Sequence, residues 1–90
     1  MKVTVEISLY PLTPHYEKPI IDFIQALKQN PKLDVYTNAM STQVAGNWSD
    51  IMPTIQTELG KVYEHVDTCS TVIKIVNKPL EIDKGHLVFE

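Results

Sequence analysis

The stretch from Asn38 to Gly46 contains the side chains best suited to hold a small molecule. It reads Asn-Ala-Met-Ser-Thr-Gln-Val-Ala-Gly, and it is polar, rich in hydroxyl groups and strand-like at the same time. A strand that only supported a core would be expected to carry more valine and isoleucine. We therefore predict that two strands meet here and that a small ligand is held at this place.

Aromatic, amide and hydroxyl side chains could supply the contacts for such a ligand. Tyr10, Tyr36 and Trp48 offer flat surfaces for stacking. The amide of Asn38 can donate and accept, which suits an aminopyrimidine edge as it suits adenine. Structural roles remain open: the tyrosines could cover a dimer interface, the hydroxyls could satisfy a turn, and Trp48 is better explained as filling the core. The hydroxyl candidates are Ser8, Thr37, Ser41 and Thr42.

Patterns typical of catalytic and metal-binding sites are missing from the sequence. His15, His65 and His86 are far apart, and none has a Cys or His partner at metal-ligand spacing. No serine lies in a Gly-x-Ser-x-Gly elbow, and the glycines are too isolated for a phosphate-binding loop. The single cysteine, Cys69, excludes an internal disulfide and resembles a small buried hydrophobe. We expect a protein that is not an enzyme and that carries no metal and no cofactor.

Length and composition indicate one folded domain over residues 1–90. The chain is 43% hydrophobic and 21% charged, which is ordinary for a globular domain with one modest core. Its net charge of -3 is spread along the chain without a lysine run, so we expect no nucleic-acid partner. No apolar stretch reaches the length of a membrane span, and the N-terminus is not a signal peptide. We therefore expect a cytoplasmic domain without membrane insertion that, being small, could form oligomers.

The periodicity of apolar residues predicts the order strand, helix, strand, strand, helix, strand. Residues 2–10 and 33–40 alternate as half-buried strands, and residues 41–45 either extend the second strand or turn back as a hairpin. The first helix begins at a Thr13 cap or near Glu17, and the second follows an Asn47 cap. Residues 68–76 form the last clear strand, and the tail, residues 79–90, adds a short strand or packs on an edge. The buried helical faces are Ile20, Phe23, Ile24 and Leu27, then Ile51, Ile55, Leu59, Val62 and Val66.

This order predicts a ferredoxin-like α+β sandwich of the βαββαβ type. Right-handed crossovers would place both helices on one face of a four-stranded antiparallel sheet. A mixed polar and aromatic opposite face, on a domain this small, predicts sheet-to-sheet dimerisation or ligand contact. That face would carry Glu6, Ser8, Tyr10, Tyr36, Asn38 and Met40.

Two short motifs resemble those of the YkoF-like thiamine-binding family. The first is Ser8-Leu9-Tyr10-Pro11, and the second is Met40-Ser41-Thr42 followed by Gly46 and an amphipathic helix. The resemblance covers residues 1–77 and implies a ferredoxin-like domain that binds thiamine or its hydroxymethylpyrimidine moiety for transport or salvage. It also implies a homodimer or homotetramer, formed through sheet faces or edges, because longer members pair two such domains in one chain. The binding residues it implies are Ser8, Tyr10, Met40, Ser41 and Thr42; we add Asn38 on physical grounds.

Two other classes of function stay open. One is a small dimeric ferredoxin-like enzyme, with His15 or Trp48 directed into a pocket. The other is a regulatory or assembly module that has another ligand or none. Phosphorylated thiamine would fit poorly, because the sequence contains no arginine. Saturable binding without turnover would distinguish the binding protein from both alternatives.

Overall fold

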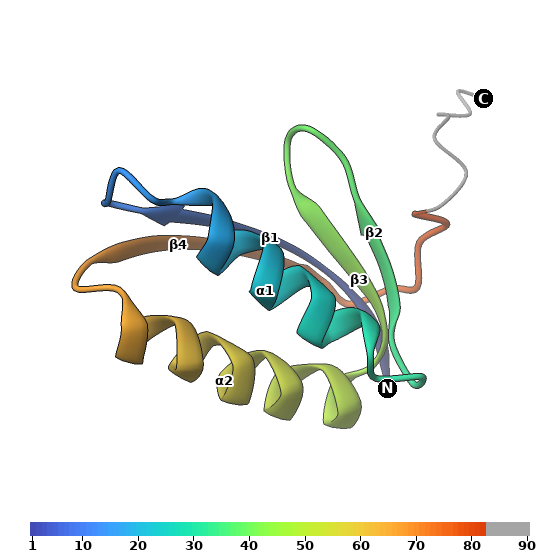
Figure 1. The fold of residues 1–90 in the computed structure, drawn as a ribbon. Helices are drawn as coiled ribbons and strands as arrows, with labels where there is room; N and C mark the ends of the chain where they lie inside the picture. Colours follow the sequence, from blue (N-terminus) through green and yellow to red (C-terminus); the bar gives the residue numbers. More distant parts are fainter. Residues whose placement is uncertain (83–90) are drawn as a thin grey trace.

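The computed structural model describes residues 1–82 and has the predicted α+β fold. Its four strands form one antiparallel sheet in the order β2-β3-β1-β4, and both helices cover one face (Figure 1). The ferredoxin-like prediction is therefore confirmed. The elements are β1 (Lys2–Pro11), α1 (Glu17–Lys28), β2 (Asp34–Thr37), β3 (Thr42–Asn47), α2 (Trp48–His65) and β4 (Cys69–Val76).

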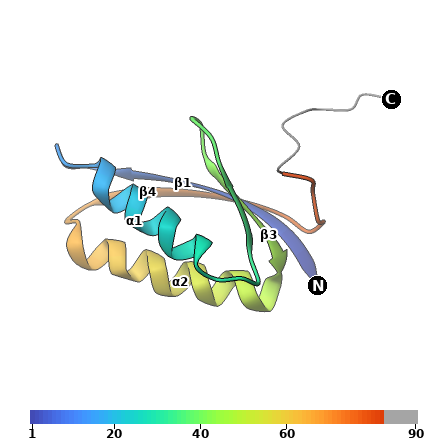
Figure 2. The ribbon, with the colours of Figure 1, turned by 45° about the vertical axis from the view of Figure 1, so that its right-hand side comes forward.

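The core lies between the sheet and the helix layer. Figure 2 shows these two layers from a second direction. In the central strand β1, the alternating residues Val3, Val5 and Ile7 point toward the helices and are at most 2% exposed. Full burial of such side chains contributes about 1.5–3 kcal/mol each. The predicted helical faces supply the opposite side of the core, through Phe23, Leu27, Ile51, Ile55, Val62 and Val66.

Helix α1 begins at Glu17, the later of the two predicted starts. Before it, the backbone N–H of His15 donates to Thr13 Oγ1 at 3.4 Å within a short turn. Pro19 falls in the first turn of the helix, where the backbone N–H groups have no intrahelical acceptor. The missing donor of this proline therefore does not interrupt the helix.

The β2–β3 connection is a tight turn that removes Asn38 and Met40 from the sheet. The backbone N–H of Asn38 donates to the Ser41 carbonyl at 3.1 Å. The side-chain Oδ1 of Asn38 accepts from the N–H of Met40 at 2.8 Å and of Ser41 at 3.1 Å. Asparagine side chains compete with strand pairing in this way. The prediction that strand continues to Met40, with Asn38 and Met40 on the open face, is therefore wrong.

The sheet face opposite the helices is partly crossed by the chain that follows β4. Thr4 is buried, and its Oγ1 donates to the Lys78 carbonyl and accepts from the Leu80 N–H, both at 2.9 Å. The face is therefore not bare at this end, because the tail is anchored across it. The part of the tail prediction that concerns residues 83–90 lies outside the described residues.

Candidate functional site

Strand β1 is paired on both sides for only part of its length. β3 pairs with β1 from Lys2 to Ile7, whereas β4 pairs with it from Thr4 to Pro11. After Ile7 the β2–β3 hairpin diverges from β1, as Figure 1 shows. Within residues 1–82, the edge of residues 8–11 that faces away from β4 is therefore left without a strand partner.

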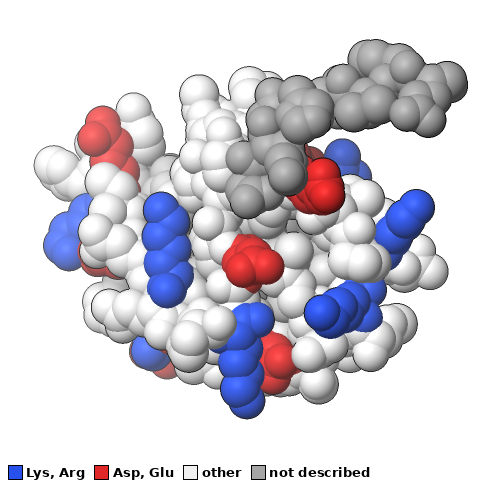
Figure 3. Space-filling view, turned by 90° about the vertical axis from the view of Figure 1, so that its right-hand side faces the viewer, with Lys and Arg blue, Asp and Glu red and all other residues white. Residues whose placement is uncertain are grey.

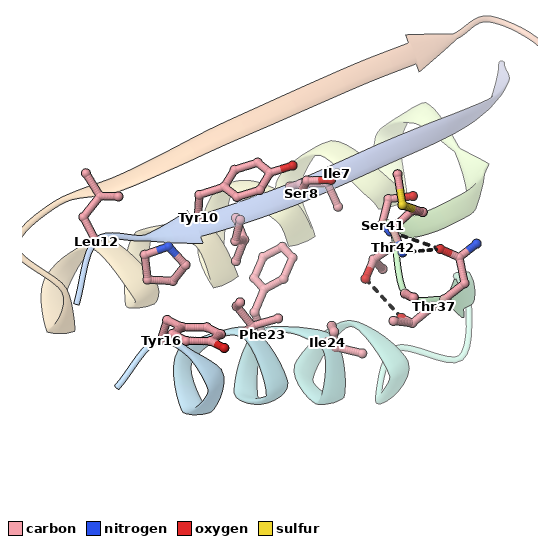
Figure 4. A pocket seen from close by; sticks show the side chains of 16 residues that line it. Ile7, Ser8, Tyr10, Leu12, Tyr16, Phe23, Ile24, Thr37, Ser41 and Thr42 are labelled. Carbon is pink, nitrogen blue, oxygen red and sulfur yellow. Dashed lines mark hydrogen bonds between the residues drawn. The ribbon is translucent and has the colours of Figure 1, made fainter. Parts of the chain in front are cut away.

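A cavity of about 480 Å³ lies beside this edge, between β1, the first half of α1 and the β2–β3 turn (Figure 4). Its volume is within the range of roughly 300–1,000 Å³ that is common for small-molecule sites. The lining is mostly apolar, and hydroxyl and amide groups gather at the turn end. The apolar residues include Ile7, Leu9, Ile20, Phe23 and Ile24.

The structure brings the five residues implied by the resemblance, together with Asn38, to this cavity. Ser8 and Tyr10 come from the end of β1, and Thr42 is the first residue of β3. The remaining residues, Asn38, Met40 and Ser41, belong to the turn. Two segments that are far apart in the sequence therefore line one cavity. That these side chains bind a ligand stays a prediction.

Helix α1 supplies lining residues that sequence reasoning missed. Tyr16 is 50% exposed at the start of the helix, and Tyr10 is 53% exposed on the β1 side (Figure 4). Phe23 lies between these sides and is only 3% exposed, so its helical spacing revealed only its role in the core. In the sequence, the one feature that could have indicated Tyr16 is the position of an aromatic residue directly before a helix.

Hydroxyl groups at the turn end already take part in defined hydrogen bonds. The Ser41 hydroxyl donates to Glu6 Oε2 at 2.9 Å. The hydroxyl oxygens of Thr37 and Thr42 share a hydrogen bond at 3.0 Å. Because Asn38 Oδ1 accepts from the turn backbone, its amide NH₂ group is the part of the side chain that these bonds do not use.

Glu6 places a negative charge beside the turn end. The hydrogen bond from Ser41, and then the hydrogen bond and positive charge of Lys74, lower the pKa of the Glu6 carboxyl. The Lys74 Nζ lies 3.3 Å from Glu6 Oε1. Glu6 is therefore a carboxylate at neutral pH, and a carboxylate can only accept hydrogen bonds.

Two of the proposed stacking residues lie away from this cavity. Tyr36 lines a separate cavity together with Leu80, which follows β4. Trp48 begins α2 and is 40% exposed, so its interpretation as a core residue is wrong. The backbone N–H of Trp48 donates to the Met1 carbonyl at 2.9 Å, and Met1 is itself 74% exposed. This end of α2 therefore lies at the surface of the part formed by residues 1–82, and the indole is partly exposed there.

The residues that an enzyme alternative would use do not line the cavity. His15 lies with His65 at a groove between the two helices. Within the described residues, no group of three or more His, Cys, Asp or Glu side chains could hold a metal ion. Neither helix of residues 1–82 combines the length and the apolar character needed to cross a membrane.

Comparisons with known proteins point to one family. The profile of the family described as thiamine-binding protein matches residues 5–84. A hypothetical protein of Methanocaldococcus jannascii has 29% identity and a TM-score of 0.75, over 86% of this chain and 80% of that one. A Thermotoga maritima protein, assigned provisionally to thiamine biosynthesis or salvage, has 19% identity and a TM-score of 0.80, over 91% of each chain.

A third solved structure has the same fold. A Bacillus cereus domain of unknown function is 19% identical, with a TM-score of 0.75, over 94% of this chain and 86% of that one. A search of curated proteins found no significant match. The structural neighbours below 25% identity support the fold alone, and the family profile carries the assignment.

Proposed function

The chain belongs to the thiamine-binding protein family, and on this premise we propose that it binds thiamine or its hydroxymethylpyrimidine moiety without transforming it, in thiamine transport or salvage. The observation that carries the proposal is the cavity at the end of β1. It is lined both by Ser8 and Tyr10 and by the Met40-Ser41-Thr42 segment, which is separate in the sequence. A family motif and a small-molecule cavity therefore coincide.

The chemistry of the lining suits both rings of thiamine. Apolar side chains provide the body of the cavity, as in most small-molecule sites. Tyr16, which lines the cavity from the helix side, offers an aromatic face to the cationic thiazolium ring. The turn end offers Asn38 and Ser41 to the aminopyrimidine ring. The Glu6 carboxylate accepts from Ser41 at 2.9 Å and is paired with Lys74 at 3.3 Å, so it holds Ser41 in place at the turn end.

The composition of the lining favours binding over catalysis. General acid–base chemistry most often uses His, Glu, Asp, Lys, Tyr or Cys within hydrogen-bond reach of the substrate. Of these types, the cavity lining within the described residues contains only tyrosine, at Tyr10 and Tyr16. We therefore expect thiamine to be recovered unchanged after incubation with the protein.

Isothermal titration calorimetry with thiamine and, separately, hydroxymethylpyrimidine tests the proposal. We expect saturable binding in the micromolar range or tighter, which corresponds to about -8 kcal/mol or better. Ser41→Ala should weaken it by about tenfold, since it removes a polar lining group. Ser49→Ala is the matched control, because Ser49 is an exposed serine in the first turn of α2. Absence of binding by folded protein would overturn the proposal.

Assembly into a homodimer or homotetramer is the second part of the proposal. Val72 of β4 pairs with Ser8, so it shares the sheet face opposite the helices, and it is 56% exposed. Tyr10, on the same face, is 53% exposed. Exposed apolar side chains on an open sheet face favour contact with a second copy. The same face supports the alternative of an assembly module without a ligand, which calorimetry distinguishes.

A further inference from the structure

The open face of the sheet, opposite the helices, is buried at one end and exposed at the other. Thr4 and its cross-strand partner Ala45 lie on this face and are 5% and 8% exposed. Tyr10 and Val72, further along the same face, are 53% and 56% exposed. Because both helices cover the other face (Figure 1), another segment of the chain must bury the Thr4 end.

The covering segment consists of residues 77–80, which we call the strap. It follows the edge strand β4 and runs back toward the β2 side of the sheet (Figure 1). Thr4 Oγ1 donates to the Lys78 carbonyl and accepts from the Leu80 N–H, both at 2.9 Å. Leu80 also lines one cavity together with Ala45 and Tyr36. The strap therefore lies over β1 and β3 and extends toward β2.

We propose that the strap is an internal cover that keeps a second copy of this chain away from the Thr4 end of the open face. While the strap is in place, a second copy can contact only the end that carries Tyr10 and Val72. When the strap leaves Thr4, the Thr4 end is uncovered and becomes a further site of self-association. This inference does not depend on thiamine binding, and it concerns where and when copies of the chain associate.

One hydroxyl group holds the strap on the sheet. Within residues 1–82, the hydrogen bonds between residues 77–80 and the sheet both involve Thr4 Oγ1. Leu80 is still 45% exposed, so the strap buries only part of its own apolar surface. Segments with few buried contacts open at a lower free energy than packed strands do. The strap can therefore detach while the sheet stays paired.

The surface under the strap is suited to contact with another sheet. Thr4, Ala45 and Val76 form one cross-strand row, which presents methyl groups and one hydroxyl. In the next row, Glu6 pairs with Lys74 at 3.3 Å, so its opposite charges offset each other and do not repel a like face. A second copy offers the same rows, and a two-fold axis brings identical patches together. Uncovered apolar groups on a sheet face favour such contact.

Thr4→Val tests the inference in the full chain, because valine keeps the shape of threonine and removes both hydrogen bonds to the strap. We expect hydrogen exchange of the Leu80 amide to become about tenfold faster or more. Sedimentation velocity should show self-association that is tighter by at least about tenfold. Thr71→Val is the matched control: it also loses a hydroxyl bond, to Tyr63, but Thr71 pairs with Leu9 on the helix-covered face.

Leu80→Pro provides a second way to release the strap. Proline has no N–H to donate to Thr4, and the substitution leaves every residue of the sheet unchanged. Tighter association of this variant could not come from a valine added to the open face. It also replaces Thr4→Val if circular dichroism shows that variant to be unfolded, and sedimentation of Leu80→Pro then decides.

Val72→Lys shows at which end the additional contact forms. Val72 belongs to the exposed end, so the gain from Thr4→Val should persist when both substitutions are combined. A gain that disappears in the combined variant would overturn the assignment to the Thr4 end.

The remaining outcomes separate this inference from the proposed function. A Leu80 amide that stays protected in folded Thr4→Val would overturn the role of Thr4 in holding the strap. Faster exchange without tighter association, or equal association of Thr4→Val and Thr71→Val, would overturn the role of the strap as a cover. Absence of thiamine binding would bear on the proposed function alone. A monomeric wild type whose strap variants associate would contradict the proposed assembly and support this inference.

Discussion

At the residue scale, the polar side chains of the β2–β3 turn use some of their atoms in hydrogen bonds within the fold and leave others for a ligand. Asn38 uses its amide oxygen to close the turn, and Ser41 uses its hydrogen to bond Glu6. Thr37 and Thr42 bond each other. The groups left for a ligand are therefore smaller in number, and more defined in direction, than the residue types alone indicate.

Asn38→Asp separates the two roles of Asn38. Aspartate keeps an oxygen that can accept from Met40 and Ser41, but it has no NH₂ group. We expect it to weaken binding of the uncharged hydroxymethylpyrimidine by about tenfold and to change the free energy of unfolding by less than about 0.5 kcal/mol. Asn38→Ala should weaken binding to the same extent and should also lower the free energy of unfolding by about 0.5–1.5 kcal/mol, because it removes the oxygen that closes the turn. Calorimetry measures the affinity of each variant, and urea denaturation measures its free energy of unfolding. Unchanged affinity of Asn38→Asp would remove Asn38 from the site.

Glu6 should make a pH-dependent contribution to stability. Its pKa in the folded state is lowered by Ser41 and Lys74, whereas the unfolded value is about 4.3. The carboxylate thus stabilises the fold above the unfolded value, and this contribution is lost as the pH falls through the folded value. The effect is small because the Glu6 side chain is 40% exposed.

Urea denaturation of the wild type and Glu6→Gln at several pH values measures this contribution. The wild type should be more stable near neutral pH, and the difference should shrink below about pH 4. Glu58→Gln is the control, because Glu58 also pairs with a lysine, Lys61, at 2.9 Å. A difference that grows on acidification would contradict the lowered pKa of Glu6.

At the element scale, the β2–β3 hairpin depends on a close approach at Gly46. Gly46 has φ of 158°, and a Cβ there would lie 3.1 Å from the Lys32 carbonyl oxygen. β3 can therefore pair with β1 and still pass close to the chain that leads into β2. The residues at the tip of this hairpin line the turn end of the cavity.

Two glycine substitutions should change the free energy of unfolding in opposite directions. Gly46→Ala should destabilise the protein by about 1–3 kcal/mol, because alanine is strained at this φ and contacts the Lys32 carbonyl. Gly60→Ala, inside α2, has nothing within 4 Å of the added Cβ and should stabilise by about 0.5–1 kcal/mol. Urea denaturation measures both, and a stable Gly46→Ala protein would contradict the close approach.

At the scale of the whole molecule, charge and apolar surface are distributed differently. On the side drawn in Figure 3, lysine side chains are scattered among acidic ones. Exposed apolar residues occur on several elements, and on the edge strand β4 three of them follow closely: Val72, Ile73 and Ile75 are 39–56% exposed. A long edge strand with apolar side chains is a natural place for another chain to associate. This distribution supports assembly through the sheet.

Val72→Lys should therefore weaken the proposed self-association. A lysine at the centre of an interface would cost about 2 kcal/mol or more, which is a thirtyfold rise or more in the dissociation constant. Ile21→Lys is the matched control, because Ile21 is 49% exposed on α1, in the helix layer. Sedimentation velocity over a range of concentrations measures the association. A wild type that is monomeric throughout, or equal effects of the two substitutions, would contradict a sheet interface.

The sequence by itself determined the order of the elements, the fold and the two segments that supply the polar lining of the cavity. Alternation in β1 and helical spacing in α2 identify buried faces because neighbouring residues share one local geometry. The motif around Ser8 and the segment ending at Thr42 likewise needed no coordinates, because their residue types and order are visible along the chain. Their meeting in one cavity follows from the antiparallel pairing of β1 and β3.

Only the tertiary structure decided how the cavity is closed and what its polar groups offer. The separation of the hairpin from β1 after Ile7, the placement of Tyr16 beside the cavity and the exposure of Trp48 depend on packing between distant segments. The bond from Ser41 to Glu6 joins residues 35 positions apart. Periodicity reports which face of an element is buried, but hydrogen-bond direction depends on three-dimensional distances, and these arise only when the layers pack together.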